Sequence, residues 1–311
     1  MLRSLFSGVS GMKSQQTKMD VIGNNVANVS TTAFKSGRAT FEDALSQTQQ
    51  SASSPTKNLG GINPKSVGLG VGISAIDTNM GQGYLQPTGG KTDLAIEGNG
   101  MFIVSKLANA EEGGSDQGDN VSEIYYTRDG SFKLDRDGNL LTADGYYVMG
   151  KRSENVVSPG EDWNSGEETP IEIVNDPAAL QKIIIPLTTT DDPPINITDF
   201  SIEQDGTIKA LYGKDTFVIG KIATAVFQNV AGLEKKGGNL YLESSNSGKP
   251  TIGTASSAGY GKVLQGHLEM SNVDLANEFT DMIITSRAFQ ANSRTITTSD
   301  EMLQELLNLK R

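Results

Sequence analysis

The chain has 311 residues, of which 36% are hydrophobic and 20% are charged, and its formal net charge is −11. It contains no Cys and one His, which excludes disulfide scaffolds, thiolate zinc sites, iron–sulfur clusters, cysteine nucleophiles and paired-His metal sites. A chain this acidic lacks the field of Lys and Arg that nucleic-acid binding needs. It has no run of about 18 apolar residues that could insert in a membrane, and its first residues lack the long apolar stretch of a cleavable secretory signal.

The first segment predicts a long helix that ends near Asn28. Between residues 2 and 26, eight positions recur at alternating spacings of three and four, and six of them are apolar. This is the spacing of the apolar seam of a coiled coil. The apolar seam positions are Leu2, Leu5, Val9, Met12, Met19 and Val26. Three Asn residues, Asn24, Asn25 and Asn28, lie near the end of this helix, and Asn24 and Asn28 are one turn apart. They mark either a fraying helix end or hydrogen bonds that fix the register against another helix.

The last segment predicts a second and longer helix over 273–311. A Ser271–Asp274 capping pattern precedes it, and no Pro or Gly interrupts it. Its apolar seam positions are Leu275, Phe279, Met282, Phe289, Ile296, Leu303 and Leu307. A single helix with such a seam needs a partner in water. The two helices either pair only with each other, or also pack against neighbouring copies and form a polymer.

The middle of the chain predicts short antiparallel strands separated by turns. Asp-Gly and Asn-Gly pairs between apolar runs are typical of tight hairpins. The pattern F-x-[LI]-[DE]-x-D-G-x-[LI] occurs at 132–140 and again at 200–208, which predicts two similar hairpins in one sheet system. We therefore expect an α+β, mostly β fold with long N- and C-terminal helices that form a coiled-coil inner domain, plus an antiparallel β-rich outer domain.

The composition also predicts the domain boundaries. A polar stretch rich in Ser, Gln and Gly predicts an extended linker, and a later stretch rich in Asp, Glu, Pro and Ser predicts a small inserted outer module. The expected parts are a terminal helical domain of 1–45 and 268–311, the linker 46–75, a β-rich domain of 76–150 and 196–267, and the inserted module 151–195.

No motif predicts catalysis, a metal or a cofactor. The glycines of 68–72 lack the spacing and the Lys of a phosphate loop. The turn 135–139 lacks the ligand spacing of a calcium loop and is better explained as a hairpin. His267 has no accompanying nucleophile motif. The sequence therefore favours a protein that is not an enzyme.

Several segments of the sequence resemble a known protein family, and their motifs are highly specific to it. They resemble the axial proteins of the bacterial flagellum, namely the rod, hook and hook-associated proteins, and the similarity is greatest to the hook proteins. The matching segments are 4–12, 19–35, 92–102, 126–132, 268–275 and 287–292.

The resemblance implies a structural subunit of the flagellar hook. Such a subunit would form a helical homopolymer tube that acts as a flexible joint and transmits torque from rod to filament. The terminal helices would line the inner tube, with the β-rich part outside. The alternative within the family is a distal rod protein, and outside the family it is a coiled-coil stalked adhesin or binding module.

The resemblance also implies partners and a location. The chain would bind copies of itself, the distal rod protein, the hook cap and the hook–filament junction proteins, and no nucleic acid. It would leave the cell through the flagellar type III export apparatus, without a cleavable signal, and would reside in the extracellular hook and basal body of the flagellum.

Overall fold

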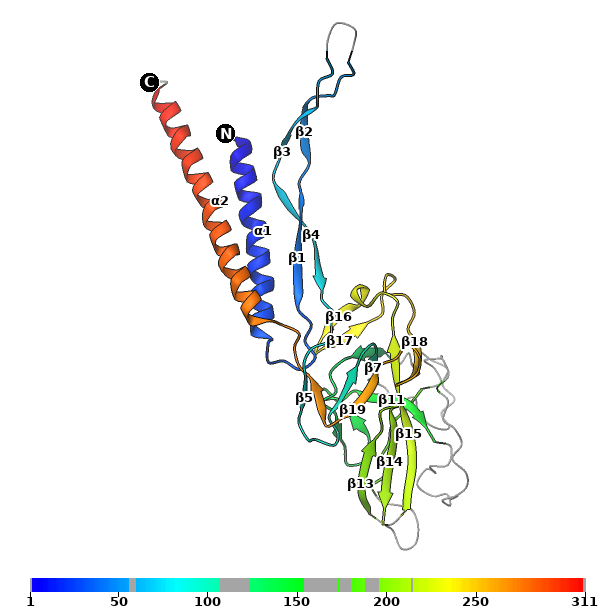
Figure 1. Cartoon of the computed structure of the whole chain (residues 1–311). Coiled ribbons are helices and arrows are strands. Elements are labelled where there is room, and N and C mark those ends of the chain that lie inside the picture. Colours follow the sequence, from blue (N-terminus) through cyan, green and yellow to red (C-terminus); the bar gives the residue numbers. More distant parts are fainter. Residues whose placement is uncertain are drawn as a thin grey trace, which may run out of the picture. The chain divides into compact units, whose positions relative to one another are not determined.

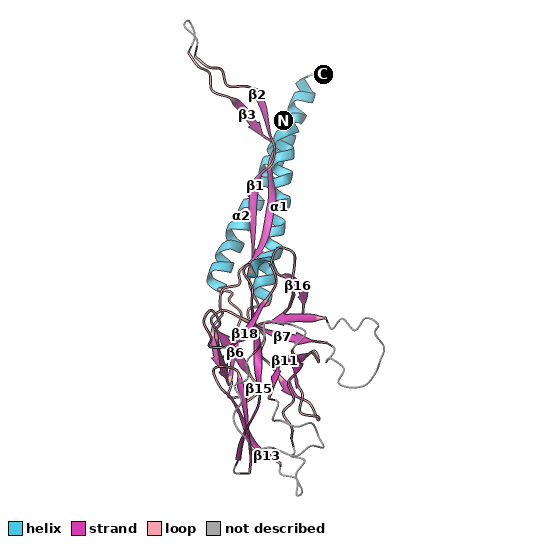
Figure 2. Ribbon diagram, turned by 90° about the vertical axis from the view of Figure 1, so that its right-hand side faces the viewer, coloured by secondary structure: helices cyan, strands magenta, loops and turns pink. Residues whose placement is uncertain are grey.

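The computed structural model describes residues 2–55, 60–106, 123–153, 173, 180–187, 196–213 and 215–309. The chain divides into two compact units, which are described separately (Figure 1). The helical unit comprises Met1–Val29, Lys35–Asn79 and Val273–Arg311, and the sheet unit comprises Ser30–Phe34 and Met80–Asn272. Figure 2 shows that the helices belong to the helical unit and most strands to the sheet unit. The predicted α+β, mostly β class is confirmed.

Two long antiparallel helices dominate the helical unit. They are α1 (Leu2–Ala27) and α2 (Leu275–Leu309). The Asp274 carboxylate caps α2 by accepting the backbone N–H of Ala276 at 2.9 Å, which satisfies one of the free donors at a helix start. Both helices occur where the heptad spacing predicts them. Neither helix in the described part of the chain combines the length and apolarity needed to span a membrane.

A two-stranded antiparallel ribbon completes the helical unit and lies beside α1 (Figures 1 and 2). Its strands are β1 (Gly37–Asp43), β2 (Ser46–Gln50), β3 (Lys65–Gly68) and β4 (Val71–Thr78). β1 pairs with β4, and β2 pairs with β3.

The ribbon differs from the linker predicted over 46–75. Within that stretch, β2 and β3 pair with each other, and the hydrogen bonds of their ladder satisfy the backbone of both strands. Every residue of β2 and β3 is exposed. With neither face buried, the strands carry no apolar alternation, and their polar composition therefore resembles that of a linker.

The sheet unit is built from antiparallel strands. They are β5 (Leu85–Pro87), β6 (Leu94–Glu97), β7 (Met101–Ser105), β8 (Ile124–Thr127), β9 (Lys133–Leu134), β10 (Leu140–Leu141), β11 (Tyr147–Arg152), β12 (Gln181–Lys182), β13 (Ile197–Ile202), β14 (Thr207–Tyr212), β15 (Asp215–Val226), β16 (Glu234–Gly237), β17 (Leu240–Leu242), β18 (Thr251–Thr254), β19 (Lys262–Gln265) and β20 (His267–Glu269), with a short 3₁₀ helix η2 (Val230–Gly232). The main sheet runs in the order β13-β14-β15-β11-β7-β8-β17-β16. Two smaller sheets pair β19 with β6 and β20 with β5.

The core lies on both faces of the main sheet. Along β7, Phe102 and Val104 pack in one apolar cluster, while Met101 and Ile103 pack in a second. Successive side chains of a strand point to opposite faces. A strand covered on both faces must be apolar throughout, which explains the unbroken run of Met101–Ser105.

The two predicted hairpins are confirmed, and their turns share one hydrogen-bond pattern. In the first, the Asp135 N–H donates to Asn139 O at 3.0 Å and the Gly138 N–H donates to Asp135 O. In the second, Glu203 and Gly206 make the equivalent bonds, to Thr207 O and Glu203 O. The glycines have φ angles of 78° and 83°, which Gly adopts at no steric cost. The sequence repeat is therefore a repeated turn.

The boundary of the predicted inserted module needs correction at its C-terminal side. Most of 151–195 lies outside the described residues, but 180–187 is described and belongs to the sheet unit. Leu180, Ile183 and Ile185 are fully buried in the core. The Ile183 N–H donates to Val148 O at 3.1 Å. The apolar run 183–185 indicates a strand in the sequence, but its pattern does not show that the strand belongs to the core of the sheet unit.

We predict that Ile183→Ala lowers the free energy of unfolding of the sheet unit by about 2–5 kcal/mol, because the lost methyl groups leave a cavity in the core. Leu187→Ala is the control, since Leu187 lies in the same segment but is 40% exposed. All eight Tyr residues lie in the sheet unit, so denaturant unfolding followed by tyrosine fluorescence reports on that unit. Equal effects of the two substitutions would show that 180–187 is not core.

Candidate functional site

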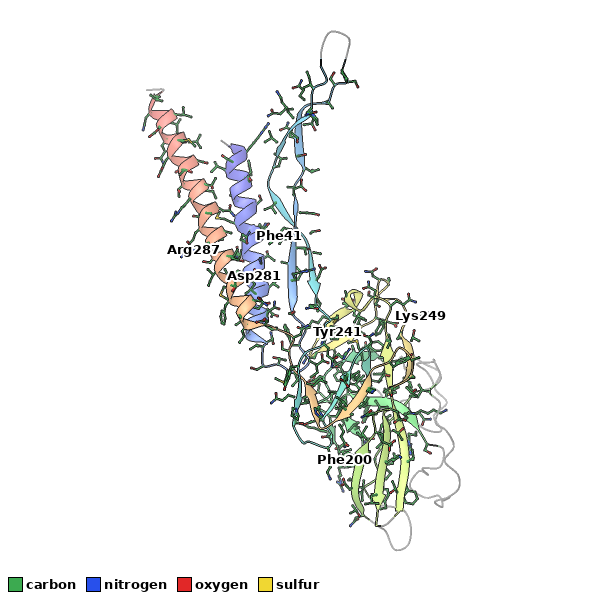
Figure 3. All side chains as sticks on the ribbon, in the orientation of Figure 1. Phe41, Phe200, Tyr241, Lys249, Asp281 and Arg287 are labelled. Atoms are coloured by element: carbon green, nitrogen blue, oxygen red, sulfur yellow. The ribbon has the colours of Figure 1, made fainter. Side chains whose placement is uncertain are left out.

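The two helices contact each other through small and polar side chains. Near one end the Ser4 and Ser299 hydroxyls lie 3.4 Å apart. Further along, Lys18 Nζ lies 3.4 Å from Asp281 Oδ1, and Figure 3 labels Asp281 on α2. Because low numbers in α1 meet high numbers in α2, these contacts fix the antiparallel arrangement.

Two glycines allow the helices to approach closely. A Cβ placed on Gly11 would lie 2.7 Å from Asn292 Nδ2, and one on Gly8 would lie 3.1 Å from Ile296 Cγ1. Both glycines are buried. Glycine lowers helix propensity by about 1 kcal/mol relative to Ala, so close packing is the physical reason for its presence in the interior of α1.

Asn25 joins three elements at the other end of the helix pair. Its side chain is 2% exposed. Its Nδ2 donates to Glu278 Oε1 of α2 at 2.9 Å and to Gly37 O of β1 at 2.8 Å. Its Oδ1 accepts the Gly37 N–H at 2.9 Å. A buried amide with three partners holds one arrangement of its neighbours, because any shift leaves polar groups unsatisfied.

Glu278 lies among other charges. Partial burial raises its pKa, and the nearby carboxylates Asp281 and Asp274 raise it further. The hydrogen bond from Asn25 and the charge of Lys18 act in the opposite direction. The first turns of α2 thus carry a carboxylate cluster that depends on α1 for its donors.

Many large apolar side chains of the two helices, most of them on α2, are exposed. Within the 35 residues of α2, the buried residues are the small polar Thr285 and Ser299. Phe279 is 50% exposed, Ile283 63% and Leu307 68%. The other exposed large apolar residues of the two helices are Phe6, Val9, Leu275, Ile284, Phe289, Met302, Leu306 and Leu309. We call this set, with Phe279, Ile283 and Leu307, the outer apolar face. Soluble monomers rarely expose so many apolar side chains together.

The predicted seam residues differ in burial, and no large apolar seam residue is fully buried among those whose side chains are described. Val9, Leu275, Phe279, Phe289 and Leu307 are exposed. Half-buried residues are Leu5, Met12, Met19, Val26, Met282, Ile296 and Leu303, and the side chain of Leu2 is not described. Ile296 contacts α1 at Gly8. That the whole set forms a polymer interface stays a prediction.

The residues that α1 buries differ from those that the heptad spacing predicts, and most are offset from a predicted position by one residue. Among the α1 residues whose burial is described, the buried ones are Gly8, Gly11, Ser14, Ile22 and Asn25. All except Ser14 lie next to a predicted seam position. Their signal is a repeat of small residues at helical spacing, which a search for apolar residues does not find.

Of the Asn residues near the end of α1, Asn25 is the one whose side chain bonds to the second helix. Asn24 is exposed, and the Asn28 side chain donates to Asn24 O at 2.9 Å at the helix end. The amide that bridges to other elements is that of Asn25.

His267 is held within the sheet unit. Its Nδ1 lies 2.9 Å from Gln265 O, and it pairs with Pro87 in the ladder of β20 and β5. Among the described residues, no group of three or more His, Asp or Glu side chains is arranged to hold a metal ion.

Comparison with known proteins identifies the family. Three family models match: "Flagella basal body rod protein" over 5–35, "Flagellar hook protein FlgE/F/G D1 domain" over 95–210, and "Flagellar basal body rod FlgEFG protein C-terminal" over 264–309. The chain is 43% identical over 318 residues to the flagellar basal-body rod protein FlgG of Bacillus subtilis, covering all of both chains. The chain belongs to the flagellar rod and hook protein family.

Both branches of this family contain full-length relatives. The chain is 31% identical over 455 residues to the flagellar hook protein FlgE of Borreliella burgdorferi, and 36% identical over 314 residues to the rod protein FlgG of the same organism. Each alignment covers all of both chains. The first and last family matches fall on α1 and α2, so the helix pair is a family feature of this chain.

We predict that Asn25→Ala speeds hydrogen exchange of the Gly37 amide at least tenfold, because the substitution leaves a part-buried donor without its acceptor, at a cost of about 1–3 kcal/mol. Asn24→Ala is the matched control, since it removes the same side chain from the adjacent exposed position. Exchange resolved by NMR or mass spectrometry on the full chain measures both. If Asn24→Ala had the same effect, helix propensity and not the Asn25 bridge would be responsible.

Proposed function

We propose that this protein is a structural subunit of the flagellar axis, which polymerises through its helix pair into a hollow tube and transmits torque without catalysing a reaction. The observation that carries the proposal is the outer apolar face of this chain, which is exposed within one copy and lies on the two helices that the family models match. Copies of the same chain are the partner, because burying these side chains against each other removes their apolar area from water. In a regular array of copies, the same apolar area is buried at every subunit contact.

The position that we propose within the axis is the rod. The rod relative of Bacillus subtilis aligns end to end over 318 residues, close to the length of this chain. The alignment with the hook relative needs 455 positions for the same 311 residues, so that relative has a long part with no counterpart here. The hook remains the second candidate, favoured by the resemblance of the N-terminal segments and by full-length coverage of hook relatives.

The proposed position in the axis also implies which proteins the subunit contacts and how it leaves the cell. A rod subunit would contact other axial proteins at the ends of its own segment and would pass through the flagellar type III export apparatus. The ribbon and the helix pair would lie in the polymer, where exposed strands such as β2 and β3 can be covered by neighbours.

We predict that Phe289→Asp abolishes tube formation and leaves the sheet unit folded. The substitution places a charge on the outer apolar face, and an unpaired charge in an apolar interface costs several kcal/mol at every subunit contact. Electron microscopy of concentrated protein and tyrosine fluorescence of the sheet unit measure the two effects.

The matched control for this substitution is Gln290→Asp, which adds one negative charge at the adjacent exposed position of α2. We expect tubes from the control, because that position is already polar. Normal tubes from Phe289→Asp would contradict the assignment of the outer apolar face to polymer contacts.

The position in the axis is tested by deleting the gene and by locating a tagged copy in isolated basal bodies. For a rod subunit we expect a truncated rod with no hook, and immunogold label between the basal rings and the hook. Label confined to the hook would overturn the rod placement and support the second candidate. Label nowhere on the axis would overturn the proposed function.

A further inference from the structure

In the sheet unit, the segments that connect it to the helical unit are hydrogen-bonded to Glu269 or to residues next to it. The chain enters the sheet unit at Ser30–Phe34 and at Met80, and leaves it at Asn272. Glu269, the last residue of β20, contacts both entering segments. Its carbonyl oxygen accepts the Ala33 N–H at 2.7 Å, and its Oε1 accepts the Gly83 N–H at 2.8 Å.

The neighbours of Glu269 add further ties among the same segments. The Met270 N–H donates to Tyr84 O at 2.8 Å, and the Asn272 side chain donates to Gly81 O at 3.0 Å. The backbones of these segments are in close contact, since a Cβ on Gly83 would lie 2.0 Å from Met270 O. Ala33 has a φ angle of 54°, which a residue with a side chain adopts only when its surroundings hold it.

Arg128 connects this point to the rest of the sheet unit. It follows β8 of the main sheet, and its Nη1 lies 3.3 Å from Glu269 Oε2. The same guanidinium donates to Ile96 O at 3.1 Å and to Gly98 O at 2.6 Å, at the end of β6. One ion pair thus joins the main sheet, the β6–β19 sheet and the β5–β20 sheet.

The pair is buried inside the sheet unit. The Glu269 side chain is 0% exposed and that of Arg128 10%. Burial lowers the pKa of Arg128, and the negative charge of Glu269 offsets part of that effect. Tyr241 of β17, labelled in Figure 3, is also close, since burial together with the Glu269 charge raises the pKa of Tyr241 to about 12. Removing one partner would leave an uncompensated buried charge.

The ladder that these contacts reinforce is short. β20 pairs with β5 through three residue pairs, in a two-stranded sheet of its own. Such a pair is marginal in isolation. The covalent connections between the units lead into the segments that contain Gly83 and Glu269.

We propose that Glu269 and Arg128 form the anchor by which the sheet unit holds its three connecting segments under torque. The anchor comprises Glu269, Arg128, Ala33 N–H and Gly83 N–H. The inference rests on the proposed function for its mechanical consequence, while its local contacts can be tested in the isolated chain. Glu269 is a positioning residue: it fixes where the connections leave the sheet unit.

The first test measures hydrogen exchange of the full-length chain carrying Glu269→Ala or Glu269→Gln. In Glu269→Ala we expect the Gly83 amide to exchange at least tenfold faster relative to the core amide of Val104. Gln keeps an oxygen that can accept the Gly83 N–H but brings an NH₂ group against Arg128. Glu269→Gln should therefore keep the Gly83 protection largely intact and raise the mobility of the Arg128 side chain. Unchanged Gly83 protection in Glu269→Ala would overturn the anchor.

The second test measures swimming of cells that carry each variant as viscosity rises. Ile183→Ala is the control, because it weakens the same unit in its core and leaves the anchor intact. We expect Glu269→Ala cells to assemble flagella and to lose them at high load, while Ile183→Ala cells keep them. If both variants lost their flagella equally at high load, the effect of Glu269→Ala would come from lower stability of the sheet unit, which would overturn the mechanical role of the anchor. Absence of the wild-type protein from the flagellar axis would instead refute the proposed function and leave the exchange result standing.

Discussion

Two helices that meet through glycine, serine and asparagine cannot bury their own large apolar side chains. The close approach at Gly8 and Gly11 uses one face of α1 for the contact within the chain. Most of the phenylalanine, isoleucine and leucine side chains of α2, such as Phe279, Ile283 and Leu307, are exposed in a single copy of the chain. Under the proposed function, burial of these side chains between copies of the chain would give assembly its driving force. The intramolecular contact supplies geometry, and the intermolecular contacts would supply most of the apolar burial.

The sheet unit has the opposite character. Its core residues are buried on both faces of the main sheet, and its turns are closed by their own hydrogen bonds. A unit of this kind can fold before assembly and keep its fold while the helices change partners. The division into two units thus separates a part that needs neighbours from a part that does not.

Much of this organisation could be predicted from the sequence. The prediction succeeds for elements whose position depends mainly on one local pattern. Heptad spacing located both helices, and the Asp-Gly turns located the paired hairpins because only a few residues adopt positive φ. The helix contact was harder: Gly8, Gly11 and Asn25 carry it, and an apolar search ignores them. The pairing of β2 with β3 could not be recognised, because exposed strands lack apolar alternation. The apolar run at Ile183 indicates a strand, but its pattern does not show that the strand belongs to the core of the sheet unit. Glu269 gave no signal, because a buried carboxylate is recognised only by the donors that the fold brings to it.

The contrast between the two kinds of polar contact bears on how the subunit would work. Asn25 is neutral and spans α1, α2 and β1, so it selects one arrangement within the helical unit with a modest desolvation cost. Glu269 and Arg128 are charged and fully surrounded, so they tolerate little displacement: separating them in a low-dielectric interior is far more costly than separating an exposed pair. A tube under torque needs both properties. Its assembling surfaces must find one register among similar apolar alternatives, which buried amides specify, and its connections must resist opening, which a buried ion pair with backbone donors achieves.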